Sequence, residues 1–275
     1  ILVMTATPIP RTLALTLYAD LDLSIIDEMP PGRTPIETRV LRRVERERAY
    51  SFVQAQIEKG RQAFIVYPLV ESSEALEDVG AAVDEYERLK NEVFYAQRVG
   101  LLHGRMNPAE KEAIMHTFAA GEIDILVSTS VIEVGIDVPN ASVILIEDAD
   151  RFGLAQLHQF RGRVGRGEHK SFCLLVAGKT SDVADQRLQA MEDTTDGFKL
   201  AEIDWEMRGA GDLLGLRQSG VGEFRLAEVM NPQQVELAQR EARTIYAEDA
   251  DLTQPEHQLL AQRIQTLRDR RADVS

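Results

Sequence analysis

Short apolar runs recur along the middle of the chain, and the segments between them place apolar residues at a helical period. Five of these runs predict strands, beginning at Ala63 (AFIVYPLV), Val99 (VGLLHG), Ile123 (IDILVSTS), Ser142 (SVILIED) and Ser171 (SFCLLVA). A run that is apolar throughout is typical of a strand buried on both faces, as in a parallel sheet covered by helices. The alternation therefore predicts an α/β fold built on a parallel sheet.

The clearest helix is predicted in the stretch NPAEKEAIMHTFAAGE. Asn107 is a favourable N-cap, Pro108 suits the first helical position, and Glu110 can complete a capping box. Ile114 and Phe118 fall on one face of this helix, which can therefore cover the sheet.

Three further segments predict helices. One helix is expected from about Glu45 to Lys59, and residues 181–203 predict a helix, a DTTDG turn and the start of a second helix. Residues 232–270 predict charged amphipathic helices, interrupted at Pro232 and Pro255. After the last predicted strand the chain is therefore expected to be helical.

The composition is that of a globular protein: 275 residues, 44% hydrophobic and 28% charged. Cys173 is the single cysteine, which excludes an intrachain disulfide and favours a reducing, cytoplasmic setting. None of the five histidines lies at metal-ligand spacing from another histidine or from the cysteine, so no zinc site is expected. The sequence contains no run of eighteen apolar residues, so no membrane-spanning helix is predicted. The chain begins inside an apolar segment without an initiator methionine, and we expect a piece of a longer protein.

Charge is distributed unevenly along a chain whose formal net charge is −14. Residues 71–92 hold eight acidic and two basic side chains, whereas residues 151–170 hold five Lys or Arg and only Glu168 as an acid. A strongly negative surface repels phosphate at long range, so any contact with nucleic acid is expected to be local. The basic stretch is where a phosphate would be tolerated.

That basic stretch contains the pattern Q-x-x-G-R-x-G-R, formed by Gln159, Gly162, Arg163, Gly165 and Arg166. Two arginines three positions apart on one helical turn can reach a single phosphate group and offer paired donors to its oxygens. The glycines allow another surface to approach closely. Taken alone, the pattern is equally consistent with a solvated basic turn.

A second motif, VSTSVIEVGIDVPNA, follows a predicted strand. Thr129 and Ser130 are expected after the carboxyl end of that strand, where α/β sheets bind ligands. Asp137, just beyond Gly135, can accept hydrogen bonds from a ribose. Alone, a strand followed by a polar loop explains this segment equally well.

Other segments carry weaker signals. Taken by itself, the segment MTATPIPRT, which contains Thr5 and Thr7, favours a strand capped by a turn. Taken by itself, the segment DWEMRGAGDLLGLRQSG (204–220) indicates only a glycine-rich loop. CLLVAGKT lacks the glycine that a phosphate-binding loop needs where Cys173 stands. Without such a loop, ILIEDAD places no nucleotide magnesium near Glu147. Neither of these last two segments is expected to bind a ligand.

In combination and in this order, TATP, GID after a strand and QFRGRVGR resemble motifs III, V and VI of superfamily 2 helicases. The resemblance implies a RecA-like helicase lobe, the second of two lobes of P-loop NTPase type. It implies that Gln159, Arg163 and Arg166 act at the γ-phosphate, the arginines as fingers, and that Gly135 and Asp137 lie near the nucleotide. The residues that it assigns to nucleic acid and to coupling are Thr5, Thr7, Thr129 and Ser130.

Longer stretches are similar to the RecG family, bacterial ATP-dependent DNA helicases that remodel stalled replication forks and Holliday junctions in DNA repair and recombination. These stretches are TATPIPRTLALTLYADLDLSIIDEMPPGRTPI, LLHGRMNPAEKEAIM, VIEVGIDVPNAS and FGLAQLHQFRGRVGRG. DWEMRGAGDLLGLRQSG resembles the translocation motif that this family shares with the transcription-repair coupling factor. The matching coupling residues are Arg187 in a helical hairpin, Arg208, and Gln218 in a loop. Ser128, Ser130, Trp205 and Asp212 depart mildly from the residues that the family pattern leads us to expect.

The resemblance implies four parts: the tail of a first RecA-like lobe (1–30), a second RecA-like lobe (31–180), a translocation hairpin and loop (181–230) and C-terminal helices (231–275). Motifs I and II do not occur in the 275 residues. We therefore expect ATP and Mg²⁺ to be bound in the full-length protein, with Mg²⁺ held by the first lobe. The fragment alone is expected to bind neither and to be inactive.

The expected partners are branched or forked DNA and, within the same chain, an N-terminal wedge domain and the first lobe. The full-length protein is expected to be a monomer that does not associate with a membrane. Two alternatives stay open: the motor lobe of a transcription-repair coupling factor, over which PPGRTPI and HGRMNPAEK favour the RecG family, and a noncatalytic nucleic-acid-binding module.

Overall fold

The computed structural model describes residues 35–68, 83–130, 137–178, 181–208 and 232–272, with the single positions 24, 26 and 28. Two compact units are present. The described residues from 26 to 208 belong to the first, and residues 232–272 belong to the second.

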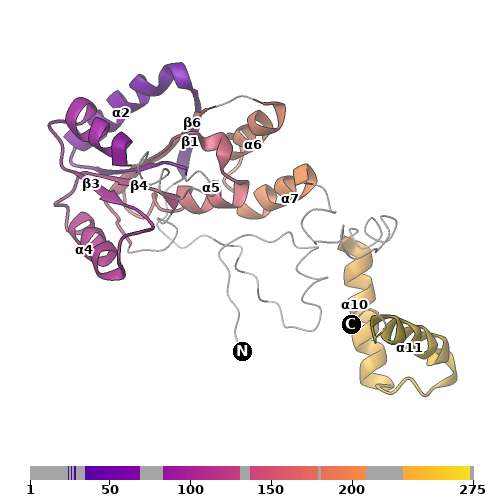
Figure 1. The fold of residues 1–275 in the computed structure, drawn as a ribbon. Helices are drawn as coiled ribbons and strands as arrows, with labels where there is room; N and C mark the ends of the chain where they lie inside the picture. The colour runs from indigo at the N-terminus through magenta and orange to yellow at the C-terminus, as the bar shows by residue number, and fades with distance from the viewer. Residues whose placement is uncertain are drawn as a thin grey trace. The chain divides into compact units, whose positions relative to one another are not determined.

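Among the described residues, six parallel strands form one sheet in the order β1-β6-β5-β2-β4-β3 (Figure 1). The strands are β1 (Ile36–Arg42), β2 (Gln62–Val66), β3 (Val99–Leu102), β4 (Ile125–Ser128), β5 (Ala141–Ile146) and β6 (Ser171–Ala177). The predicted α/β fold with a parallel sheet is confirmed, and each of the five predicted runs contains a strand. The sequence pattern does not predict β1, because polar and charged residues interrupt the apolar run of this edge strand.

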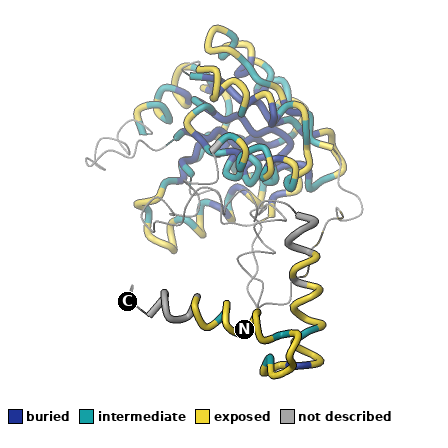
Figure 2. Tube along the Cα trace, turned by 90° about the vertical axis from the view of Figure 1, so that its right-hand side faces the viewer, coloured by how far each residue is buried: buried dark blue, intermediate teal, exposed yellow. Residues whose placement is uncertain are grey.

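Helices cover both faces of the sheet. In the described residues of the first unit, these helices are α2 (Arg46–Glu58), a helix over 83–88 that continues into η2 (Leu89–Val93), α4 (Pro108–Ala119), α5 (Leu154–Arg161), α6 (Asp182–Asp193) and α7 (Gly197–Arg208). In β2, Ala63 and Ile65 belong to one apolar cluster with residues of α2 and η2, while Phe64 and Val66 belong to another with residues of α4, α5 and α6. The core therefore has two layers with the buried strands between them, as Figure 2 shows.

The predicted helices are confirmed. At the start of α4, the Asn107 side chain accepts the backbone N–H of Glu110 at 2.9 Å, and the Glu110 carboxylate accepts the N–H of Asn107 at 3.0 Å. This is the expected capping box. α2 lies within the helix predicted over 45–59, and α6 and α7 form the predicted helix pair, with α7 extending to Arg208.

The described part of the second unit is a pair of helices, α10 (Pro232–Glu248) and α11 (Gln258–Ala272), in the region where helices are predicted. The turn between them is organised by Asp249, whose carboxylate accepts the N–H groups of Thr253 and Gln254, each at 2.9 Å. His257 Nδ1 lies 2.9 Å from the same carboxylate. The hydrogen bonds from Gln254, His257 and Thr253 hold the pKa of Asp249 well below its usual range. Across the described residues, no helix is long and apolar enough to cross a membrane.

Candidate functional site

The finger loop, residues 162–167, follows α5 and carries both predicted arginine fingers. Gly162 is the C-cap of α5, and the N–H of Arg163 donates to the carbonyl of Phe160 at 2.9 Å in a final tight turn. Gly165 then has φ +79°, in the left-handed region that favours glycine. The prediction that Arg163 and Arg166 share one helical turn is therefore wrong, because α5 ends before them and Gly165 redirects the backbone.

The finger loop packs against the segment that leads into β5. A Cβ atom added to Gly167 would overlap the backbone carbonyl of Pro139, so only glycine fits this close approach. Pro139 and Asn140 directly precede β5, and the Asn140 carbonyl accepts the N–H of Gln62 at the start of β2 at 3.1 Å. The finger loop therefore lies at the amino edge of the sheet.

This packing brings Arg166 to Asp137. Arg166 Nη1 donates to the Asp137 carboxylate at 3.0 Å, and Arg166 Nε donates to the carbonyl of Gly162 at 3.1 Å. The Arg166 side chain is 27% exposed and the Asp137 side chain 56% exposed. Asp137 and Arg166 are 29 positions apart in the sequence, and their two motifs meet here in an ion pair that solvent can reach.

The other two predicted catalytic residues, Gln159 and Arg163, are half-buried. Gln159 lies in the last turns of α5, and Arg163 is the second residue after that helix. Gln159, Arg163 and Arg166 thus come from one short segment of chain at the amino edge of the sheet.

Arg161, which the sequence analysis did not single out, is 2% exposed. Its Nη1 donates to the carbonyls of Met191 at 2.9 Å and Thr194 at 2.8 Å, and its Nη2 lies 3.0 Å from Nδ1 of His158. Burial lowers the pKa of the Arg161 guanidinium. Helical periodicity in the sequence could have indicated this burial. Arg161 follows Leu157 by one helical turn and therefore lies on the buried side of α5.

Arg161 also has an electrostatic effect on the single cysteine. Burial raises the pKa of the Cys173 thiol to about 12, and the charge of Arg161 acts in the opposite direction. Cys173 is a free, buried thiol in β6.

Thr129 and Ser130 lie at the opposite, carboxyl edge of the sheet, just beyond β4, as expected. The Thr129 N–H donates to the carbonyl of Leu102 at 3.2 Å. Thr129 is fully buried, and its Oγ1 has no hydrogen-bond partner among the described residues. The structure does not bring this pair together with Arg166 and Asp137. The motif that contains Thr129 and Asp137 therefore contributes to both edges of the sheet.

The predicted coupling residues fall mainly around the helix pair α6–α7. Arg187 in α6 donates from Nη1 to the carbonyls of Asp150 at 3.4 Å and Phe152 at 3.3 Å, just before α5. Arg208 is the last residue of α7. Thr5, Thr7, Gly135 and Gln218 lie outside the described residues.

Glu147, which was expected not to hold a metal, is engaged in an ion pair after the carboxyl end of β5. Its side chain is 0% exposed, and Arg46 donates to it from Nη2 at 2.8 Å and from Nε at 2.9 Å. Tyr50 donates its hydroxyl to the other carboxylate oxygen at 2.7 Å. Burial tends to lower the pKa of Arg46, but the hydrogen bond and charge of Glu147 outweigh it and raise that pKa. Within the described ranges, no group of three or more His, Cys, Asp or Glu side chains is arranged to hold a metal ion.

Comparisons with known proteins define the class first. Residues 46–168 match the helicase conserved C-terminal domain, so the sheet that carries the finger loop is a helicase C-terminal lobe. Residues 194–275 match the C-terminal part of domain 3 of the ATP-dependent DNA helicase RecG.

The chain belongs to the RecG family. It is 53% identical over 253 residues to the ATP-dependent DNA helicase RecG of Synechocystis sp., covering 92% of this chain and 30% of that protein. It is 48% identical over 261 residues to RecG of Bacillus subtilis, covering 94% of this chain and 38% of that protein. The solved structure of RecG bound to a three-way DNA junction superposes with a TM-score of 0.68 at 47% identity, covering 85% of this chain and 30% of that one. The chain thus spans about a third of the length of these relatives.

Proposed function

We propose that this chain forms the second motor lobe and the translocation elements of an ATP-dependent DNA helicase that remodels branched DNA, including stalled forks and Holliday junctions. In this proposal residues 31–180 are the lobe, 181–230 the translocation hairpin and loop, 231–275 the C-terminal helices, and 1–30 the tail of a first lobe. Branched DNA is the partner in the solved RecG complex that resembles this chain.

The observation that carries the proposal is the Arg166–Asp137 pair. Exposed ion pairs contribute about 0–1 kcal/mol, so Arg166 can exchange Asp137 for a phosphate oxygen at small cost. A guanidinium keeps its charge and offers paired donors to phosphate. Arg166 can therefore bind an incoming anion, because its ion pair with Asp137 costs little to break.

The site fits a triphosphate presented by a facing lobe. Arg163 and Arg166 would contact the γ-phosphate and stabilise the charge that develops during phosphoryl transfer, Gln159 would lie nearby, and Asp137 would be released toward the ribose with Gly135 beside it. Mg²⁺ would neutralise phosphate charge when bound. The described residues offer it no ligand cluster, so it would be held by the facing lobe.

DNA contacts are proposed for the opposite edge of the sheet, where Thr129 and Ser130 follow β4. Thr5 and Thr7 would link the nucleotide and DNA sites, and Arg187, Arg208 and Gln218 would couple hydrolysis to movement. In this proposal, hydrolysis takes place at one edge of the sheet and DNA binds at the other. Substitutions at the finger loop should therefore spare DNA binding.

The test is the DNA-stimulated ATPase of the full-length protein with Arg166→Ala or Arg163→Ala. Arginine fingers contribute about 10³- to 10⁵-fold in rate, so we expect turnover to fall about 10³-fold or more, with forked-DNA affinity changed by less than about twofold. Arg98→Ala is the matched control, because Arg98 pairs with Asp124 at the same edge of the sheet but far from the finger loop in the strand order. Normal turnover combined with weakened DNA binding would instead indicate a basic DNA-binding turn.

A noncatalytic DNA-binding module is tested by titrating labelled duplex DNA with the chain at several salt concentrations. The net charge of −14 leads us to expect weak binding. Tight binding with a steep salt dependence would favour the module.

A further inference from the structure

Two arginines fasten α5 and α6 to each other, each by binding backbone carbonyls of the other segment. Arg161, at the end of α5, binds the carbonyls of Met191 and Thr194 at the end of α6. Arg187, within α6, binds the carbonyls of Asp150 and Phe152 that precede α5. The helices pack against each other (Figure 1), and α5 is held to α6 near both of its own ends, whereas α6 contributes its middle and its C-terminal end.

The Arg161 contact is unusual for a buried guanidinium, because no ion pair with Arg161 occurs in the described part of the chain. Its partners are two carbonyls and His158. The carbonyls at the C-terminus of α6 supply partial negative charge, which favours a cation there. Apolar residues of similar volume usually stabilise a core as well as or better than a buried charge. The contact is therefore better explained by the geometry that it fixes than by stability alone.

The finger loop has anchors that do not involve the Arg161 side chain. The Gly162 N–H donates to the carbonyl of His158 at 3.0 Å, Val164 is fully buried, and Arg166 Nε donates to the carbonyl of Gly162. Gly167 packs on the backbone of Pro139. Loss of the Arg161 side chain should therefore leave the finger loop in place.

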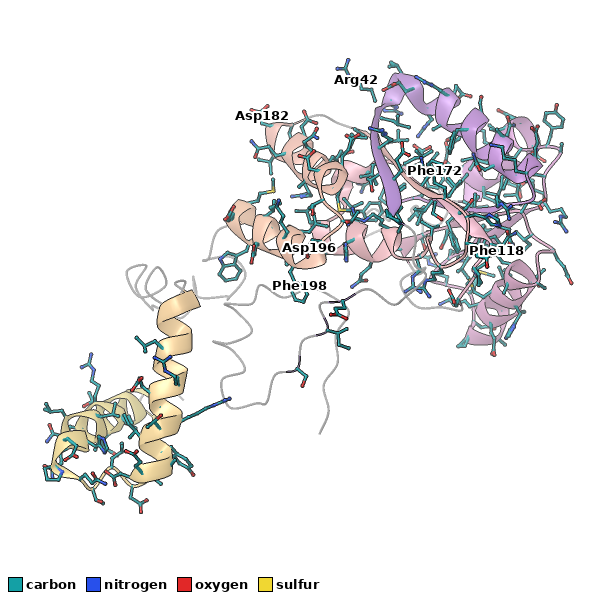
Figure 3. All side chains as sticks on the ribbon, turned by 180° about the vertical axis from the view of Figure 1, so that it is seen from behind. Arg42, Phe118, Phe172, Asp182, Asp196 and Phe198 are labelled. Carbon is teal, nitrogen blue, oxygen red and sulfur yellow. The ribbon has the colours of Figure 1, made fainter. Side chains whose placement is uncertain are left out.

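The α6–α7 turn depends on Arg161 to a greater extent. Arg161 holds the Thr194 carbonyl at 2.8 Å, and two residues later Asp196 caps α7 by accepting the N–H of Phe198 at 2.9 Å. Figure 3 labels Asp196 in this turn and Asp182 at the other end of α6. What the Arg161 side chain contributes is the link between the α6–α7 turn and the end of α5, one residue before the finger loop.

We infer that Arg161 is a positioning residue that transmits displacement of the finger loop to the α6–α7 helix pair, so that ATP hydrolysis moves DNA. This inference rests on the proposed function and adds a residue to it. Arg161 touches neither nucleotide nor DNA in this role. Its loss should uncouple hydrolysis from unwinding while hydrolysis continues.

The experiment compares Arg161→Lys and Arg161→Met in the full-length protein, measuring DNA-stimulated ATPase and fork unwinding in the same samples. For both variants we expect kcat and KM for ATP within about threefold of wild type, and for Arg161→Met we expect fork unwinding per ATP hydrolysed to be at least about tenfold lower. Lysine keeps the charge, but a single ammonium group replaces both Nη1, which binds the two carbonyls, and Nη2, which contacts His158, so it should restore coupling only in part. Arg98→Met, which removes the same atoms from an arginine outside α5 and α6, should leave both readouts unchanged.

The outcomes separate this inference from the proposed function. If Arg166→Ala retains ATPase, the proposed function fails. If Arg166→Ala is inactive while both Arg161 variants unwind normally per ATP, only the inference on Arg161 is overturned. It is also overturned if ATPase and unwinding fall in parallel, because a purely structural role predicts that result. Should Arg161→Met fail to fold, Arg161→Lys decides between these outcomes.

Discussion

The lobe contains two arginine–carboxylate ion pairs, Arg46–Glu147 and Arg166–Asp137. Their arginines are similarly exposed to solvent, but the exposure of their carboxylates differs widely. Arg46 and Arg166 are similarly covered, with side chains 21% and 27% exposed. Glu147 is 0% exposed and also accepts a hydrogen bond from Tyr50, whereas Asp137 is 56% exposed. The first pair lies after the carboxyl end of β5 and the second before its amino end.

This difference separates a structural ion pair from one that can exchange its partner. A buried carboxylate that loses its cation has no water to replace it, so the Arg46–Glu147 pair is fixed. A solvated carboxylate loses little when its arginine leaves. Of the two arginines, Arg166 is therefore the one available to an incoming phosphate.

The largest effect is expected from Glu147→Ala, which leaves Arg46 and Tyr50 without their shared acceptor. Breaking a buried pair costs about 3–5 kcal/mol, and partial exposure of Arg46 puts the expected loss near the lower end of that range. Urea unfolding of the chain, followed by circular dichroism, measures it. A loss below about 1 kcal/mol would mean that the two pairs are energetically alike.

A second prediction concerns the closure of the Glu147 region to solvent. Burial, together with the charge of Glu147, raises the pKa of Tyr50, and burial with the charge of Tyr50 raises that of Tyr67. Because the neutral phenols are favoured in the folded state, their contribution to stability is present below the unfolded pKa of about 10 and is lost as pH rises through the folded value.

Ultraviolet titration of the folded chain should therefore leave Tyr50 and Tyr67 un-ionised at about pH 11, and unfolding should release them. Ionisation of Tyr50 and Tyr67 near pH 10 without unfolding would show that this region is open to water.

Gly165→Ala tests whether the finger loop depends on its backbone. A non-glycine residue in the left-handed region costs about 1–2 kcal/mol, and Gly165 has φ +79°. We expect destabilisation of this size in the same unfolding assay. Gly104→Ala is a suitable control. A Cβ atom added to Gly104 meets no atom within 4 Å, and the φ angle of Gly104 is not in the left-handed region. Equal effects at the two glycines would remove the argument for a specific loop conformation.

The smallest effect is expected from Asp137→Ala. Because the pair with Arg166 is exposed, its loss should change the free energy of unfolding by about 1 kcal/mol or less. Comparison with Glu147→Ala in one experiment tests the contrast directly. A large loss at Asp137 would indicate that Arg166 is a structural residue.

The sequence allowed much of the fold to be predicted, because buried parallel strands and capped helices have strong local signals. β2 is buried throughout and apolar from Ala63 to Val66, and the capping box of Asn107 is complete within four residues. β1 has no such signal, since its position at the sheet edge tolerates Thr38 and Arg39.

The site was harder to predict because its geometry depends on contacts that leave no local pattern. Because α5 ends before Arg163 and Gly165 redirects the backbone, Arg163 and Arg166 do not share a helical turn, although their spacing fits one. Asp137 follows Thr129 by eight residues, yet it lies before β5, at the edge of the sheet opposite to Thr129, and no local pattern indicates this. Arg161 binds backbone carbonyls, which any residue provides, so no partner could be named from the sequence.

The central claim is that Arg166 leaves Asp137 to bind a transferring phosphoryl group, and the most direct test is nucleotide affinity. In the full-length protein, Arg166→Ala should weaken binding of ADP–aluminium fluoride, a mimic of the transition state, by about a hundredfold or more. Affinity for ADP should change by less than about twofold. Equal affinity of the variant and wild type for ADP–aluminium fluoride would contradict the account.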